Sequence, residues 1–261
     1  MLTWMRDRRR RELLAEPFPP SWLEPLRENV AHYGLLSAEE QARLRDDLRI
    51  LIAEKHWEGC GGLSMTDEVR VTIATQACLL TLSLEHDYYP TVESILVYPA
   101  GFVATERTHS PDGVVTEQRS ARLGEAWAIG GTGGPVVLSW QDALAGGKNA
   151  ADGRNVVLHE FAHKLDMRDG IPNGVPRLHS AVEYDRWADV MSSEFEQLVR
   201  ASEHHEATLL DKYGATDAGE FFAVATECFF ERPRDMRDTH AALYALFREY
   251  YRQDPAARLN A

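Results

Sequence analysis

The stretch Val156-Val-Leu-His-Glu-Phe-Ala-His-Lys-Leu-Asp166 decides how the rest of this chain is interpreted. On an α-helix, residues four apart lie on one face, so His159 and His163 can each direct an imidazole nitrogen at a single ion. Glu160 projects beside them, where its carboxylate could take a proton from a metal-bound water. The spacing His159-Glu160-x-x-His163 therefore predicts a zinc-binding helix.

The alternative is an exposed helix that carries two solvated histidines. Apolar residues surround the polar ones, however: Val156, Val157, Leu158, Phe161, Ala162 and Leu165. A helix that is apolar on most faces is buried, and buried histidine and glutamate need partners. These neighbours favour the metal site.

The chain has 261 residues, of which 44% are hydrophobic, so it can bury a large core. We expect an α+β fold, mostly helical, with a small mixed sheet beside the zinc helix. No linker is long enough to force a domain boundary. We therefore expect a single domain over residues 1–261, with a helical N-terminal part (about 1–60) packed on a core (about 61–261).

A net charge of -13 argues against binding to nucleic acid or to anionic membranes. No apolar run approaches the ~20 residues of a membrane span. The basic run Arg8–Arg11 lacks the apolar region that would follow it in a signal peptide. The three cysteines, Cys60, Cys78 and Cys228, are an odd number without close pairing, and we expect a cytoplasmic protein.

Turn residues and apolar periodicity divide the chain into elements. Ser37 and Glu40 have capping-box spacing at the start of a helix, and Thr66 can cap another that runs to about Leu84. Further helices are expected at about 152–168, 181–203, 217–231 and 236–252, and a short one from Ser139 that Gly146-Gly147 ends. Strands are expected at 95–98, around 114–115, at 126–129 and at 135–139.

The strand at 135–139 directly precedes the zinc helix. It could offer an exposed edge that holds an extended peptide, or it could be an ordinary strand within the sheet. The glycines at 130–134 that introduce it resemble a phosphate-binding loop only loosely, because no Gly-Lys-Ser/Thr follows. Flexibility or close backbone approach explains them better.

A catalytic zinc site needs three protein ligands and one open position. Asp169 has the spacing of a third ligand in metzincins, but that motif needs glycine at position 166, where this chain has Asp166. Glu220 and Glu227 offer another solution, because they lie seven residues apart on one face of an apolar helix. A capping box with Asp217 could explain Glu220 alone, but not both acids.

The motif from His159 to Asp166, together with Tyr213-Gly-Ala and Glu220-Phe-Phe-Ala, resembles the Mlc titration factor A family of zinc peptidases. The catalytic domain of anthrax lethal factor is similar in arrangement. The resemblance implies a zincin-like fold and one Zn²⁺ per chain, bound by His159, His163 and Glu220. It also implies that Tyr213 supplies an auxiliary hydroxyl group and that Glu227 supports the ligands from behind.

The resemblance further implies a gluzincin-like zinc peptidase in which Glu160 is the general base. Aminopeptidase action on short peptides is what the family suggests. A charged residue such as Lys164 is unusual in zincins but agrees with this family. Asp166 could orient a ligand imidazole or could be a surface residue.

Two other functions stay open. The family is named for sequestering Mlc, a transcriptional repressor that controls glucose uptake through the phosphotransferase system. This chain could therefore be a regulatory binding protein, with or without proteolysis. A purely structural zinc site would need a fourth protein ligand, and the sequence contains no fourth candidate as good as the first three.

Overall fold

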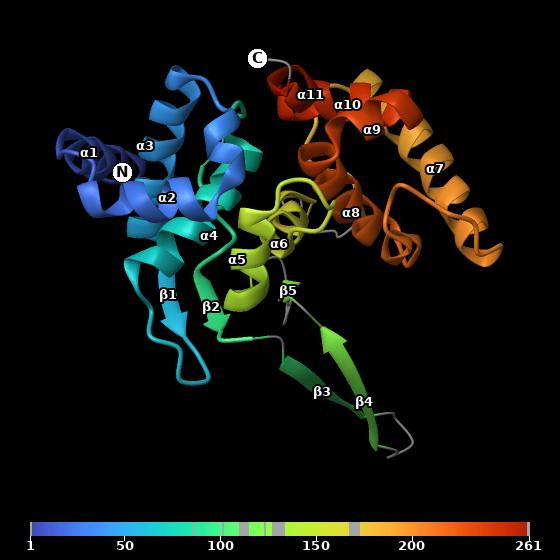
Figure 1. Ribbon diagram of the computed structural model, residues 1–261, viewed down its shortest axis with the longest axis horizontal. Coiled ribbons are helices and arrows are strands. Elements are labelled where there is room, and N and C mark those ends of the chain that lie inside the picture. The colour runs from blue at the N-terminus through green and yellow to red at the C-terminus, as the bar shows by residue number, and fades with distance from the viewer. Residues whose placement is uncertain are drawn as a thin grey trace.

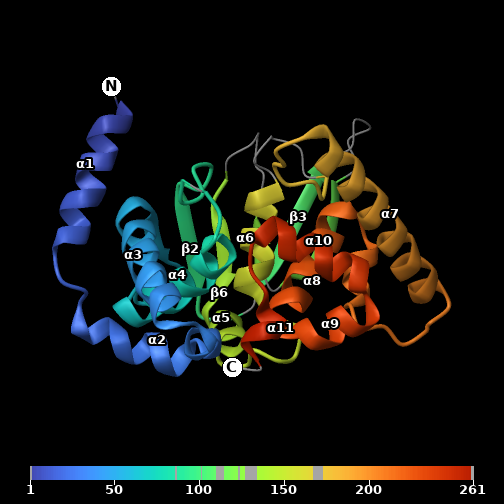
Figure 2. The same ribbon diagram turned by 90° about the horizontal axis from the view of Figure 1, so that it is seen from above.

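The computed structural model describes residues 2–85, 87–100, 102–109, 115–122, 124–126, 134–166 and 173–259. Helices from the N-terminal part of the chain lie on one side of the molecule and helices from the C-terminal part on the other (Figure 1). A small sheet and the helix with the histidine motif lie between the two groups (Figure 2). The fold is mostly helical with a small sheet, which confirms the α+β class.

The N-terminal helices follow the expected capping signals. Ser37 accepts a hydrogen bond from the backbone of Glu40, and the Glu40 carboxylate accepts one from the Ser37 backbone, so the capping box is confirmed. Thr66 caps the next long helix. The elements are α1 (Leu2–Ala15), η1 (Pro20–Trp22), α2 (Leu23–Asn29), η2 (Ala31–Leu35), α3 (Ala38–Glu54) and α4 (Asp67–Thr81).

The sheet is mixed, as expected. Its strands run in the order β1 (His56–Gly59), β2 (Ser94–Tyr98), β6 (Val136–Ser139) and β5 (Gly124–Ala126). The first three are parallel, and β5 is antiparallel to β6. We expected the segment that forms β1 to be helical. Four residues carry too little periodicity to reveal a strand, and the distant pairing with β2 decides this one.

β6 has neighbours on both of its edges. Val136 pairs with Ile95 of β2 on one side and with Ala126 of β5 on the other. The expectation that residues 135–139 offer an exposed edge to a peptide is therefore wrong. β5 lies at the end of the strand order, beside β6.

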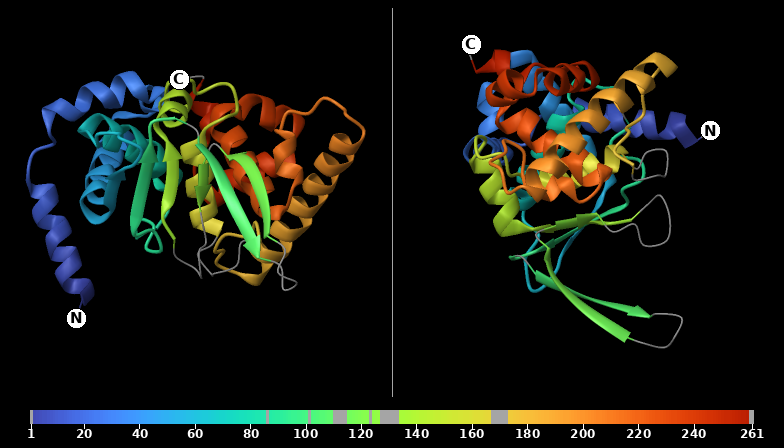
Figure 3. Two further views of the ribbon diagram at one scale, coloured as in Figure 1. Left: turned by 90° about the horizontal axis from the view of Figure 1, so that it is seen from below. Right: turned by 90° about the vertical axis from the view of Figure 1, so that its right-hand side faces the viewer.

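A separate antiparallel hairpin joins β3 (Phe102–His109) to β4 (Val115–Arg122). It extends away from the helices and the mixed sheet (Figure 3). The sequence did not reveal β3, and β4 is longer than the short strand expected around residue 115. The glycines at 130–133 and residues 127–129 lie outside the described residues.

Helix α5 (Trp140–Lys148) includes Gly146-Gly147 and ends at Lys148, one residue after them, so the predicted end is right to within one residue. A Cβ atom on Gly147 would lie 2.4 Å from the Asn29 carbonyl oxygen and 2.9 Å from Gln76 Nε2. These glycines therefore also allow the last turn of α5 to pack closely against α2 and α4.

Helix α6 (Val156–Asp166) carries the histidine motif. It begins at Val156 and not near Asp152, because Asn155 accepts hydrogen bonds from the first free N–H groups, those of Val157 and Leu158. It packs against α4, α5, α8 and the β5–β6 edge of the sheet.

The C-terminal group contains the second helix expected to carry chemistry. Its elements are α7 (Ala181–Glu203), η4 (Lys212–Ala215), α8 (Ala218–Glu231), α9 (Pro233–Thr239), α10 (Ala241–Tyr251) and α11 (Pro255–Arg258). The single helix expected at 236–252 is two helices that meet at His240. The ring of Trp187 stacks on Phe247 and meets the edge of Phe222, which ties α7 and α10 to α8.

Among the described helices, none has the length and apolar character that crossing a membrane requires. Cys78 and Cys228 are buried and Cys60 is half-buried, and all three are free.

Candidate metal centre

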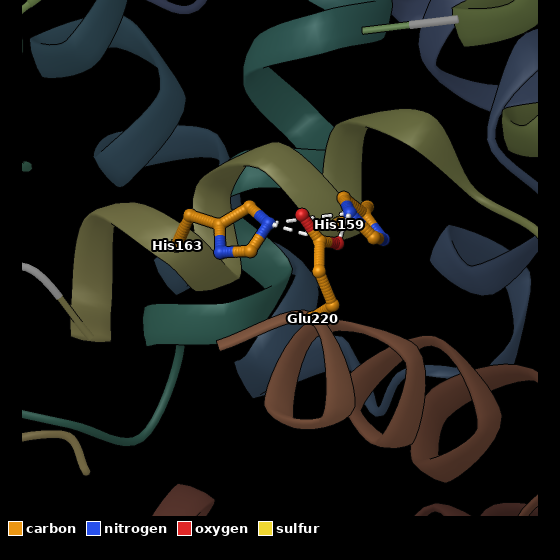
Figure 4. Close-up of side chains that lie close together, drawn as sticks. All are labelled: His159, His163 and Glu220. Carbon is orange, nitrogen blue, oxygen red and sulfur yellow. Dashed lines mark hydrogen bonds and ion pairs between the residues drawn. The ribbon is translucent and has the colours of Figure 1, made fainter. Parts of the chain in front are cut away.

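Three side chains from two helices converge on one point. His159 and His163 extend from α6, and Glu220 extends toward them from the first turn of α8 (Figure 4). One ligand atom from each residue lies within 4.8 Å of the other two. The structure thus brings together the three residues expected to bind the metal.

The closest atoms are the ones that bind metals. His159 Nε2 lies 3.0 Å from Glu220 Oε2, and His163 Nε2 lies 3.2 Å from His159 Nε2 and 3.5 Å from Glu220 Oε2. Burial by itself would raise the pKa of Glu220, but its hydrogen bonds with the two histidines outweigh burial and hold that pKa far below its usual range. Burial opposes a charge on His159, yet the hydrogen bonds to Glu220 and Glu227 raise its pKa well above the ordinary value.

Two imidazole nitrogens and one carboxylate oxygen form a ligand set that suits a catalytic zinc ion. In the part of the chain that the structure describes, no fourth histidine, cysteine, aspartate or glutamate joins the group. One coordination position would remain open to water or substrate, whereas structural zinc sites have four protein ligands. Asp169, the alternative third ligand, lies outside the described residues.

Glu227 holds His159 from the side opposite the ligand position. Its Oε1 lies 2.7 Å from His159 Nδ1, and its Oε2 accepts a hydrogen bond from the backbone N–H of Asn155. A carboxylate on Nδ1 fixes the ring and leaves Nε2 to bind the metal. Asp166 is also buried, and burial raises its pKa, but neither of its oxygens bonds a ligand imidazole.

Glu160 is 2% exposed, and its Oε2 has no hydrogen-bond partner among the described residues. Burial raises the pKa of this carboxyl group, while His159 and His163 act in the opposite direction. A buried carboxylate oxygen without a partner is costly, so this position is adapted to a proton or to a bound molecule.

Lys164, the residue unusual for zincins, is buried on the same helix. Its Nζ donates a hydrogen bond of 3.3 Å to the carbonyl oxygen of Gly134, just before β6. Burial lowers the pKa of this ammonium group, and the negative charge of Glu160 partly restores it. Its charge thus faces the interior near Glu160 and not the solvent.

Tyr213, on η4, is an exposed residue beside His159. Its ring centroid is 6.1 Å from that of His159, and the side chain is 53% exposed. Asp211 holds this turn, because its Oδ1 accepts from the Tyr213 backbone and its Oδ2 pairs with Arg154 at 3.0 Å. The hydroxyl-bearing residue is therefore supported from the segment that precedes α6.

Sequence reasoning missed a third acid on the same face of α8. Glu231 Oε2 accepts hydrogen bonds from the backbones of Gly153 and Arg154, at 3.0 and 2.9 Å. Burial raises the pKa of Glu231 to about 9, so the group is neutral at pH 7. Its spacing from Glu227, four residues, could have indicated that it shares the helix face directed at α6.

Residues 4–252 match the family described as glucose-regulated metallo-peptidase M90. An uncharacterized protein of Synechocystis sp. is 40% identical over 253 residues, which are 97% of this chain and 90% of the relative. Mlc titration factor A of Salmonella agona is 35% identical, over 86% of this chain and 83% of the relative. Mlc titration factor A of Yersinia enterocolitica is 31% identical, over 98% and 92%. The chain belongs to the glucose-regulated metallo-peptidase M90 family, which implies a metal ion.

Proposed function

We propose that this chain is a zinc-dependent peptidase of the gluzincin type, with a zincin-like fold, that acts as an aminopeptidase on short peptides. The observation that supports it best is the convergence of His159, His163 and Glu220 beside the buried carboxylate of Glu160, whose Oε2 has no partner among the described residues. Family membership supports a metallopeptidase in general, and the ligand set favours zinc.

A zinc ion held by His159, His163 and Glu220 would supply a Lewis acid and a water of lowered pKa. Glu160 would take the proton from the attacking water and deliver it to the leaving amine. Its raised pKa, caused by burial, suits a group that holds a proton between these two steps. Tyr213 would donate a hydrogen bond to the oxygen of the scissile carbonyl, where one such donor is worth about 2.7–4 kcal/mol.

We infer that the substrate lies extended along β5. This strand ends the strand order of the sheet and packs against α6, and the described residues pair it with β6 on one side. A peptide that adds to such an edge is held by main-chain hydrogen bonds close to the metal ligands. β5 takes the role that we first expected for residues 135–139.

Glu160→Gln tests the proposal. The variant should bind zinc like the wild type, because Glu160 is not a ligand, and it should lose peptidase activity by a factor of about 10² to 10⁴. Zinc content and cleavage of a peptide library measure the two effects, and Glu39→Gln on the exposed surface of α3 is the matched control. Full activity of Glu160→Gln would refute the assignment.

Acetylated N-termini should block cleavage if the enzyme is an aminopeptidase.

The names of the relatives favour a second function, a regulatory protein that sequesters an Mlc-like transcriptional repressor. A pull-down with the repressor, using zinc-loaded, zinc-free and Glu160→Gln protein, separates the two functions. Capture by all three forms would support regulation independent of proteolysis. Both functions agree with the predicted cytoplasmic location. The similarity to the catalytic domain of anthrax lethal factor, which the sequence suggested, is a separate prediction.

A further inference from the structure

A chain of buried polar groups leads from α4 to the back of His159. It consists of Gln76 on α4, Asn155 directly before α6, and Glu227 on α8, which are 0%, 1% and 8% exposed. Three separate elements thus meet behind one ligand imidazole. Buried amides are costly unless they are hydrogen-bonded, so their partners show what they hold in place.

Asn155 is the centre of this chain. Its Oδ1 accepts from the backbones of Val157 and Leu158, at 3.1 and 3.0 Å. Its Nδ2 donates to Gln76 Oε1 at 2.9 Å, and its backbone N–H donates to Glu227 Oε2. The same residue therefore begins the zinc helix and fixes the carboxylate that contacts His159 Nδ1.

Gln76 has a single allowed orientation. Its Nε2 donates to the carbonyl oxygens of Thr72 and Ala143, at 3.0 and 3.1 Å. Two acceptors at the nitrogen leave only the oxygen to face Asn155 Nδ2. Gln76 thereby connects α4 and α5 to the residue that precedes α6.

Gly146 and Gly147 of α5 make room for this arrangement. A Cβ atom on Gly146 would lie 3.1 Å from Asn155 Cα and 3.2 Å from Asn155 Cγ. A Cβ atom on Gly147 would lie 2.9 Å from Gln76 Nε2. The backbone of α5 packs directly against both amides, so side chains at these positions would displace them.

We propose that Gln76 and Asn155 are positioning residues of the metal site, which hold Glu227 and through it the imidazole of His159. Glu227 reaches His159 through a flexible side chain, and its second oxygen is anchored by the Asn155 backbone. Without Gln76, the buried Nδ2 of Asn155 loses its acceptor, and Asn155 moves to find another. The inference rests on the proposed metal site.

The test uses Gln76→Leu and Asn155→Ser. Leucine is similar in size but has no amide, and serine still caps a helix but is too short to reach Gln76. Each variant should bind zinc about tenfold more weakly in competition with a chelator, at the lower end of the effect of groups behind metal ligands. The visible spectrum of the Co²⁺-loaded protein should change in both, because it reports ligand geometry.

Gln253→Leu is the matched control. Gln253 is also a buried amide, and its side chain donates to the carbonyl oxygen of Leu79 at 2.8 Å and accepts from Arg258. Within the residues that the structure describes, it forms no hydrogen bond with α6. This variant should lose stability with no change in zinc affinity or in the Co²⁺ spectrum. Both substitutions remove the same hydrogen bond between Gln76 and Asn155. The double variant Gln76→Leu/Asn155→Ser should therefore bind zinc only slightly more weakly than whichever single variant has the lower affinity.

Folded Asn155→Ser or Gln76→Leu protein with wild-type zinc affinity and an unchanged Co²⁺ spectrum would overturn the inference. If Gln76→Leu does not fold, Asn155→Ser decides by itself. A wild-type chain that binds no zinc would instead refute the proposed function, so the two failures are distinguishable.

Discussion

Single buried side chains show how strongly the interior controls protonation in this protein. His32 lies between the N-terminal and C-terminal helices, where its Nε2 contacts the carbonyl oxygen of Phe230 at 3.2 Å. Burial lowers the pKa of His32 to about 4. The folded protein thus keeps this imidazole neutral at pH values at which the unfolded chain protonates it.

This shift predicts acid sensitivity. The pKa of His32 is about 4 in the folded protein and 6.5 in the unfolded chain. The folded state is therefore not penalised by His32 above pH 6.5, and it loses free energy of unfolding as the pH falls from 6.5 toward 4, where only the unfolded chain binds the proton. From pH 7 to pH 4.5 the free energy of unfolding should fall by about 2 to 3 kcal/mol on account of His32. Urea unfolding at both pH values measures this fall. In His32→Gln, the free energy of unfolding should fall less between the two pH values, because the part due to His32 is absent. An equal pH dependence in that variant would assign the effect to other groups.

A glycine beside α8 gives a second prediction at this scale. Gly174 has a φ of +72°, and a Cβ atom there would lie 2.3 Å from the carbonyl oxygen of Ala218, the first residue of α8. Gly174→Ala should destabilise the fold by more than the roughly 1–2 kcal/mol that a left-handed alanine costs. Thermal unfolding measures the loss. Gly34→Ala, with no atom near the new Cβ, should have a small effect, and equal effects of both would contradict the reasoning.

At the scale of elements, α8 is defined by the acids on one of its faces. Glu220 faces the two histidines, Glu227 contacts His159 Nδ1, and Glu231 accepts from the loop before α6. The spacings of seven and four residues put all three on the face that packs against α6. One helix thus supplies the proposed third metal ligand and also supports the helix that carries the other two proposed ligands.

Glu220→Ala should therefore weaken zinc binding sharply, because it removes the ligand that we propose α8 contributes. Affinity measured against a chelator tests this, and Glu231→Gln serves as comparison, since it keeps an acceptor for Gly153 and leaves the ligands intact. If Glu220→Ala bound zinc with unchanged affinity, the third ligand would have to be another residue, such as Asp169, because Glu227 lies behind His159.

For the whole molecule, the proposed ion joins α6 to α8, which are separated in sequence by α7. A ligand that binds the folded form stabilises it, by about 2.7 kcal/mol at a free concentration roughly one hundred times Kd. Removing zinc with a chelator should therefore lower Tm, and adding zinc should restore it. His163→Ala should show no such zinc-dependent shift. A Tm that does not respond to zinc in the wild type would exclude a site at this place.

The sequence determined the local features of this protein. The capping box of Ser37 and Glu40, the bounds of α7 and α8, and the helix with its two histidines all depend on residues a few positions apart. Such signals act through local hydrogen bonds and helical periodicity, which can be read from the chain. Glu220 was found among other candidates because two acids on an apolar helix need a partner.

Only the tertiary structure decided the features that depend on distant pairing. β1 exists because it pairs with β2, and β6 became an interior strand because β5 pairs with its other edge. Gly146 and Gly147, which resemble a helix end in sequence, also pack against Gln76 and Asn155. The positions of Glu227 behind His159 and of Tyr213 beside His159 were fixed in the same way. Burial and pairing between remote segments set these outcomes, and no local pattern encodes them.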